Sequence, residues 1–277
     1  MYNSYWGFHR SPFSGSIDPE RFYESPSHEE ALARLTYVVD EARQGALVLG
    51  AAGTGKTLLA EVFAQRMRRP NRQVVIARSS ALGGRELFYE LCQEFSLGPN
   101  RDASEGELWR TLRQHAVANR INGGQTVIVV DHAHWLLETA AQLRSMHLLF
   151  QLDTHAESRT TVVLVGRPEL MRGARSEVVE SVDLGVVVEP LSLEHTGLYV
   201  SHATNWACRD EPAFSEDAIE KIQNLTNGVP RQINRVCDLA LLAGATEELD
   251  RVTENVIDSV FRELSPEAAL DQLAVAV

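Results

Sequence analysis

The chain has 277 residues, of which 44% are hydrophobic, so it can bury a large core in one domain or in a large and a small one. Its formal charge of -12 argues against broad, non-specific attraction to nucleic acid or anionic lipid, because both are polyanions. The sequence has no basic start followed by a long apolar run, and no apolar stretch of about eighteen residues. We therefore expect a globular, cytoplasmic protein that does not insert into a membrane.

Short runs rich in Val, Ile and Leu alternate with helical patterns between residues 46 and 191. Continuous apolar strands separated by helices are typical of a parallel sheet that helices cover on both faces. The sequence therefore predicts an α/β fold. We predict strands at 46–50, 73–77, 126–131, 160–166 and 184–191, with helices at 56–69, 84–95, 105–120 and 140–153 between them.

The pattern becomes purely helical from Ser192 onward. We predict helices at about 194–207, 215–226, 230–244 and 253–263. The chain should accordingly consist of an α/β core at 1–191 that includes the N-terminal segment, a small all-helical lid at 192–265 and a flexible tail at 266–277.

The segment GAAGTGKT, at 50–57, fits the pattern G-x-x-x-x-G-K-T and lies between the first predicted strand and the first predicted helix. Glycines let the chain wrap closely round a triphosphate, so that backbone N–H groups and the positive end of the helix face its oxygens. We expect ATP to bind here, with Lys56 on the β- and γ-phosphates and the Thr57 hydroxyl on Mg²⁺. The alternative, a glycine-rich turn that binds nothing, is disfavoured by the flanking strand and helix. The predicted nucleotide-binding residues are Gly50, Ala51, Ala52, Gly53, Thr54, Gly55, Lys56, Thr57 and Leu58.

The predicted strand TVIVVD ends in Asp131. Open α/β sheets bind ligands at the carboxyl ends of their strands, so this carboxylate would emerge beside the phosphate loop. There it would hold Mg²⁺ through water, which makes Thr57 and Asp131 the predicted metal ligands. An aspartate that only caps the following helix is the alternative.

Several sequence blocks occur in the order typical of one family. The opening segment carries the pieces Tyr-x-x-x-[aromatic]-Gly, Pro-Phe, Asp-Pro and Ser-x-x-His-x-x-Ala-Leu, and it is followed by VLGAAGTGKT, VVDHAHWL, VVLVGRPEL and LTNGVPRQINRVCDLALLA. Over roughly residues 1–260, the chain therefore resembles the AAA-type ATPases called general secretion pathway protein A.

This resemblance implies an ATP-binding AAA domain followed by a helical lid, related also to the ATPases that select targets in some transposition systems. Members of the secretion family work with a partner to help assemble the outer-membrane secretin of type II secretion. The resemblance thus implies a homo-oligomer with a protein partner, which in that family is associated with the cell envelope.

The resemblance also extends to two residues outside the phosphate loop. Arg231 in GVPRQIN matches the lid arginine that senses the γ-phosphate, and a permanent cation directly after the helix-starting Pro230 suits that role. A surface arginine paired with an acidic neighbour is the alternative. His28 lies in the segment that borders the adenine base, although a residue that packs one helix on another would fit equally well.

Three regions of the sequence depart from the family pattern. Residues 131–134 read Asp-His-Ala-His where the family usually has Asp-Glu-Ala-Gln, and Arg167 replaces a glutamine. The segment directly before the fifth strand is acidic where family members have an arginine that could reach a neighbouring subunit. Arg172 and Arg175 are weaker candidates for that arginine.

His132 stands where the family has the glutamate that orients and polarises the attacking water. A neutral imidazole can accept a proton near pH 7, but it is bulkier than a carboxylate. We therefore predict that Lys56, Asp131, His132 and Arg231 are the catalytic residues, and that hydrolysis is slow or needs an activator. Two functions stay open: an ATPase that assembles or remodels a partner, and an ATP-loaded switch or scaffold that turns over little.

Two further alternatives concern metal and nucleic acid. Asp131, His132 and His134 have residue types and spacing that could hold a metal such as zinc. A DNA-linked role like that of the transposition relatives would require an oligomer that concentrates basic patches, such as Arg66 to Arg72, against the acidic net charge. Nucleic acid is therefore a disfavoured partner that the sequence leaves open.

Overall fold

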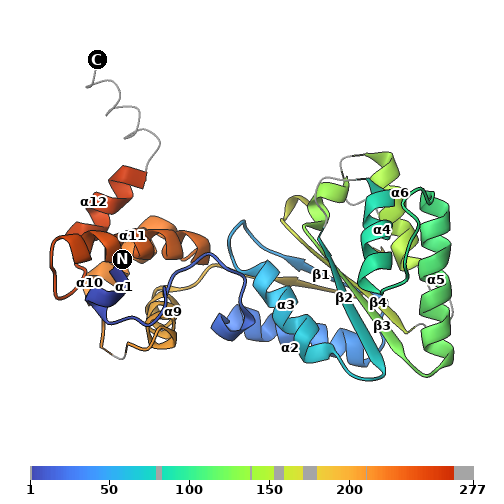
Figure 1. The fold of residues 1–277 in the computed structure, drawn as a ribbon, viewed down its shortest axis with the longest axis horizontal. Coiled ribbons are helices and arrows are strands. Elements are labelled where there is room, and N and C mark those ends of the chain that lie inside the picture. Colours follow the sequence, from blue (N-terminus) through green and yellow to red (C-terminus); the bar gives the residue numbers. More distant parts are fainter. Residues whose placement is uncertain are drawn as a thin grey trace, which may run out of the picture. The chain divides into compact units, whose positions relative to one another are not determined.

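The computed structural model describes residues 2–78, 83–137, 139–152, 159–170, 180–209 and 211–264, and the chain forms two compact units (Figure 1). Pro26–Glu189 form one, the core unit, while Met1–Ser25 and Pro190–Val277 together form the other, the helical unit. The predicted tail at 266–277 lies outside the described residues, as do Arg172 and Arg175.

Five parallel strands form the sheet of the core unit, in the order β2-β3-β4-β1-β5. The predicted α/β fold is confirmed, and β3 and β4 are buried along their whole length, as their apolar sequences require. The fifth strand ends at Val187 and not at residue 191, because its neighbour β1 ends at Leu49, which is paired with Val187. The strands are β1 (Gly45–Leu49), β2 (Arg72–Arg78), β3 (Gln125–Asp131), β4 (Thr160–Gly166) and β5 (Leu184–Val187).

Helices cover both faces of this sheet. Figure 1 shows α2 and α3 on one face and α4, α5 and α6 on the other. Capping boxes define the first residues of α5 and α6, because Ser104 pairs with Glu107 and Thr139 pairs with Gln142. The helices are α2 (Pro26–Asp40), α3 (Lys56–Met67), α4 (Gly84–Glu94), α5 (Glu105–Ile121) and α6 (Ala140–Phe150), and a 3-10 helix, η2, spans Ala133–Leu137.

The helical unit combines the C-terminal helices with the N-terminal segment. None of the described helices in either unit is both long and apolar enough to span a lipid bilayer. The elements of the helical unit are α1 (Tyr2–Trp6), a 3-10 helix, η1, at Pro19–Arg21, α9 (Leu193–Trp206), α10 (Glu216–Thr226), α11 (Pro230–Thr246) and α12 (Glu254–Leu264).

The N-terminal segment packs differently from the sequence-based expectation, which placed it with the α/β core. Trp6 is only 2% exposed, and its indole N–H donates to the Leu241 carbonyl oxygen of α11 at 2.7 Å. Phe8 and Phe13 are buried in the same apolar cluster as Cys237 of α11. A buried indole needs an acceptor for its N–H, and α11 supplies one. These aromatic contacts group residues 2–25 with the helical unit.

Candidate functional site

The phosphate-loop segment at 50–57 connects β1 to α3 at the carboxyl end of the sheet. Gly55, directly before α3, has a φ of 96°, a left-handed conformation that favours glycine. A Cβ on Gly50 would lie 2.6 Å from the backbone oxygen of Val188, so no side chain fits there. The first N–H groups of α3 follow at once, and such groups at a helix start have no partner within the helix. The segment thus has the backbone shape of an anion-binding loop.

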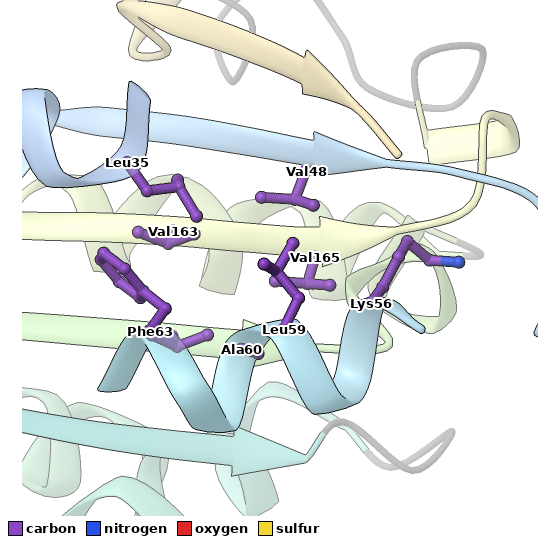
Figure 2. A pocket seen from close by; sticks show the side chains of 9 residues that line it. Leu35, Val48, Lys56, Leu59, Ala60, Phe63, Val163 and Val165 are labelled. Atoms are coloured by element: carbon purple, nitrogen blue, oxygen red, sulfur yellow. The ribbon is translucent and has the colours of Figure 1, made fainter. Parts of the chain in front are cut away.

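Lys56 is the first residue of α3, and its ammonium bends back over the loop. Its Nζ donates to the carbonyl oxygen of Gly50 at 2.8 Å and to that of Ala51 at 2.7 Å. Figure 2 shows its nitrogen pointing away from the apolar side chains that lie behind it. The positive charge is therefore held at the edge of the loop, where it can neutralise anionic oxygens.

The apolar seam behind Lys56 is a packing contact between α3 and the sheet (Figure 2). It has no room for a water molecule, so it is not a ligand site. Its role is to fix the helix whose first turn carries Lys56 and Thr57. The apolar residues that line it are Leu35, Val48, Leu59, Ala60, Phe63, Val129, Val163 and Val165.

Thr57 and Asp131 meet across the gap between α3 and β3. The Thr57 hydroxyl donates to Asp131 Oδ2 at 2.7 Å, and Asp131 is only 3% exposed. A hydroxyl and a carboxylate are hard oxygen donors, the type that Mg²⁺ prefers. The two predicted metal ligands are thus adjacent, and their chemistry fits a magnesium ion that is shared with phosphate oxygens and water.

His132 follows Asp131 in a left-handed conformation, with a φ of 58°. This turn brings its Nδ1 to 3.2 Å from Asp131 Oδ2, while its backbone N–H donates to Asp131 Oδ1 at 2.8 Å. The imidazole is about half exposed. It therefore bends back onto the carboxylate that would hold Mg²⁺.

His134 lies next to the end of β4. A Cβ on Gly166 would be 3.5 Å from His134 Nδ1, and both ring nitrogens are buried without a hydrogen-bond partner among the described residues. Burial lowers the pKa of His134, and the positive charges of Arg167 and Lys56 lower it further. The imidazole is therefore neutral over most of the physiological pH range.

The suggestion that Asp131, His132 and His134 form a metal site gains no support from this arrangement. Within the described part of the chain, no group of three or more His, Cys, Asp or Glu side chains is placed to hold a metal ion. The Thr57 and Asp131 pair is of a different kind, because it would share its ion with phosphate and water.

The structure brings most of the predicted site residues together in the core unit. The loop 50–57, Leu58, Asp131 and His132 all lie at the carboxyl end of β1 and β3. Arg231 is the second residue of α11 and belongs to the helical unit.

Sequence reasoning did not identify the contact that His28 makes with the phosphate loop. His28 of α2 is 4% exposed, and its Nε2 lies 3.1 Å from the carbonyl oxygen of Thr54. It begins a buried stripe that continues with Ala31, Leu32 and Leu35 at helical spacing. A polar residue in line with such a stripe was the available signal.

A parallel sheet with a phosphate loop after its first strand, and a carboxylate at the end of β3 that is bonded to the loop threonine, defines a P-loop nucleotide-binding protein.

Comparison with known proteins narrows this class. Residues 38–172 match the family described as AAA domain. General secretion pathway protein A of Aeromonas hydrophila is 31% identical over 269 residues, which are 96% of this chain and 49% of that relative. The chain therefore spans about half the length of the curated relative it matches. These two comparisons confirm the resemblance to the AAA-type ATPases called general secretion pathway protein A.

Solved structures share the fold at low sequence identity. The ORC1 protein of Aeropyrum pernix, solved in complex with DNA, matches 93% of this chain and 70% of its own, with a TM-score of 0.72 and 16% identity. The ORC2 protein of that organism, in ADPNP-ADP complexes, matches 92% of this chain and 72% of its own, with a TM-score of 0.73 and 14% identity. At such identities the likeness concerns the fold alone, and it agrees with the predicted AAA-type core followed by helices.

Proposed function

We propose that this chain binds ATP together with Mg²⁺ and couples binding, with slow or activator-dependent hydrolysis, to the assembly or remodelling of a protein partner. The observation that carries this proposal is the 2.7 Å hydrogen bond between the Thr57 hydroxyl and Asp131, at the mouth of a phosphate loop with the expected shape. The pair joins the element that would hold the phosphates to the element that would hold the metal.

Each residue has a distinct role in this proposal. The loop N–H groups and the Lys56 ammonium would bind the β- and γ-phosphates, and Thr57 and Asp131 would hold Mg²⁺. Held by these two side chains, Mg²⁺ would supply positive charge against the negative charge that develops on the phosphate oxygens. Arg231, at the positive start of α11, is the residue to which the family resemblance assigns the sensing of the γ-phosphate.

Slow hydrolysis follows from the conformation at position 132. Cleavage of the γ-phosphate needs a group that orients the attacking water. The imidazole of His132 instead faces the carboxylate of Asp131, at 3.2 Å, through a left-handed turn. The group that would orient water is therefore engaged with the metal ligand.

The same observation favours a second candidate function, an ATP-loaded switch or scaffold that hydrolyses little or nothing. Such a protein would oligomerise or dock a partner in its ATP state. The general secretion pathway relative supports a secretion-linked partner, for which the family resemblance implies a place at the cell envelope, and the acidic charge disfavours DNA. In both versions we propose a cytoplasmic homo-oligomer.

One set of measurements separates these two functions. Phosphate release from Mg-ATP is compared between wild type and Lys56→Ala, and oligomeric state is followed with ATP and with ADP. An ATPase gives release above the level of the variant. Release equal to that of the variant, together with tight ATP binding by wild type, supports the switch. Absence of Mg-ATP binding by folded wild type would contradict both.

A further inference from the structure

We infer that His28 is a positioning residue of the phosphate loop, which holds the Thr54 carbonyl so that the N–H group of Gly55 faces the bound phosphate. The inference rests on the proposed function, because it concerns the same nucleotide site. It gives a role to a side chain on α2, outside the loop and outside the end of β3.

The hydrogen bond itself is well defined. His28 Nε2 lies 3.1 Å from the Thr54 oxygen, and the side chain is almost completely buried. A carbonyl oxygen only accepts hydrogen bonds, so Nε2 must carry the proton. A buried carbonyl that lost this donor would be left without a replacement from water.

The planarity of the peptide bond transmits this contact to the phosphate side. The carbonyl of Thr54 and the N–H of Gly55 belong to one planar unit and point in opposite directions. Fixing the carbonyl toward α2 therefore fixes the N–H toward the opposite side. Gly55 is the position that needs such control, because a glycine at a φ of 96° resists rotation of this plane only weakly.

The imidazole also occupies the space beneath the loop. A Cβ on Gly55 would lie 2.9 Å from His28 Nε2, so the ring packs directly against the backbone at this point. Ala31 and Leu35, on the same buried stripe of α2, hold the helix in place. A ring that is 4% exposed and bonded to the loop has little surface left for contact with a base.

The test compares three ligands: Mg-ATP and Mg-GTP, which carry different bases, and magnesium tripolyphosphate, which carries none. Affinities are measured by calorimetry, with competition for the weakest ligand, on wild type, His28→Leu and His28→Gln. The Gln amide nitrogen can reach the place of Nε2. The matched control is His115→Leu, because His115 bonds to Gln73 at the start of β2, the opposite end of the sheet.

We expect His28→Leu to weaken all three ligands by about tenfold, as the loss of one buried donor implies, with the ratio of ATP to GTP affinity unchanged. His28→Gln should recover most of the affinity, and His115→Leu should bind as wild type does. A role confined to helix packing would not give recovery by Gln.

Three results would overturn the inference. They are unchanged affinities in His28→Leu, an altered ratio of ATP to GTP with unchanged tripolyphosphate binding, and a His28→Gln variant as weak as His28→Leu. If His28→Leu does not fold, His28→Gln and His28→Asn decide, because the shorter Asn amide reaches only the place of Nδ1. Equal tripolyphosphate affinity in these two variants would contradict the inference. The proposed function is tested separately by wild type and Lys56→Ala, so it can stand when the His28 inference fails.

Discussion

The phosphate loop and the tip of β3 are neighbours in the core unit, yet they differ in how closely they follow the family pattern. The loop keeps the pattern, with glycines at 50 and 55 and the Lys56 ammonium above them. The tip of β3 keeps Asp131 but continues into His132, whose ring folds back onto that carboxylate.

This difference separates two tasks that the same site would perform. Holding a triphosphate with its metal depends on the loop, Thr57 and Asp131, whereas cleaving it depends on the group that orients water. Binding and hydrolysis should therefore respond to different substitutions.

Removal of the Lys56 ammonium from the loop should have the largest effect on Mg-ATP binding. Lys56→Ala is expected to weaken Mg-ATP binding by at least about a hundredfold, because it removes the charged donor nearest the β- and γ-phosphates. Calorimetric titration measures the change. The control is Lys221→Ala, the other lysine of the chain, which pairs with Asp258 in the helical unit and should leave the affinity unchanged. Equal affinities for the two variants would contradict the role of the loop.

A substitution at the tip of β3 should increase activity instead of reducing it. His132→Glu restores a carboxylate and is expected to raise phosphate release by about tenfold to a hundredfold, since positioned acid–base groups contribute on that order. The ATP dissociation constant should stay within about twofold. His132→Gln serves as the control, because an amide cannot take the proton. No increase with Glu would show that the imidazole is not what limits hydrolysis.

The link between the two regions is the Thr57 hydroxyl. Thr57→Val keeps the shape of the side chain but removes the hydroxyl that contacts Asp131. Wild type should lose about tenfold in ATP affinity when Mg²⁺ is chelated. The variant should bind ATP weakly even with Mg²⁺ present, and chelation should not change its affinity. Titrations with and without EDTA measure this. A variant that still gains affinity from Mg²⁺ would remove Thr57 from the metal site.

His134 should give the smallest effect, and it depends on pH. Its pKa lies below the usual value of 6.5 because of burial and the nearby cations. Below pH 6.5 the unfolded chain therefore binds a proton at this residue more readily than the folded chain does. With respect to His134, the free energy of unfolding is highest above pH 6.5 and decreases as the pH falls below that value.

We therefore expect the melting temperature of His134→Leu to fall less than that of wild type as the pH drops below 6.5. We also expect it to be higher by about 2 °C, because the substitution removes two buried nitrogens that have no hydrogen-bond partner among the described residues. Thermal unfolding between pH 5 and 8 measures it. The exposed histidine in His9→Leu is the control, and a His134→Leu profile that matches wild type would contradict this account. Unchanged ATP binding by His134→Leu would also argue against a zinc site formed by His132 and His134.

Much of the fold was accessible from the sequence because β3 and β4 are buried on both faces, and such strands must be apolar throughout. The phosphate loop was equally accessible, because its glycines and lysine follow fixed spacing. Asp131 was predicted from its place at the end of an apolar strand, and in the structure it accepts a hydrogen bond from Thr57.

Other features depended on contacts that no local pattern encodes. The N-terminal segment joins the helical unit through Trp6, whose acceptor on Leu241 is distant in sequence. His28 contacts the loop from a helix that precedes it, and nothing in the spacing indicated a bond to Thr54. The turn of His132 onto Asp131 is a left-handed conformation that is uncommon for any residue other than glycine, and no local spacing indicated it.

The separation of binding from cleavage is tested most directly by single-turnover cleavage, in which excess protein is mixed with labelled Mg-ATP. Wild type is expected to retain ATP and leave it largely intact, while His132→Glu should retain it equally well and convert it to ADP. Cleavage by wild type at the rate of His132→Glu, or no retention of ATP by wild type, would contradict this separation.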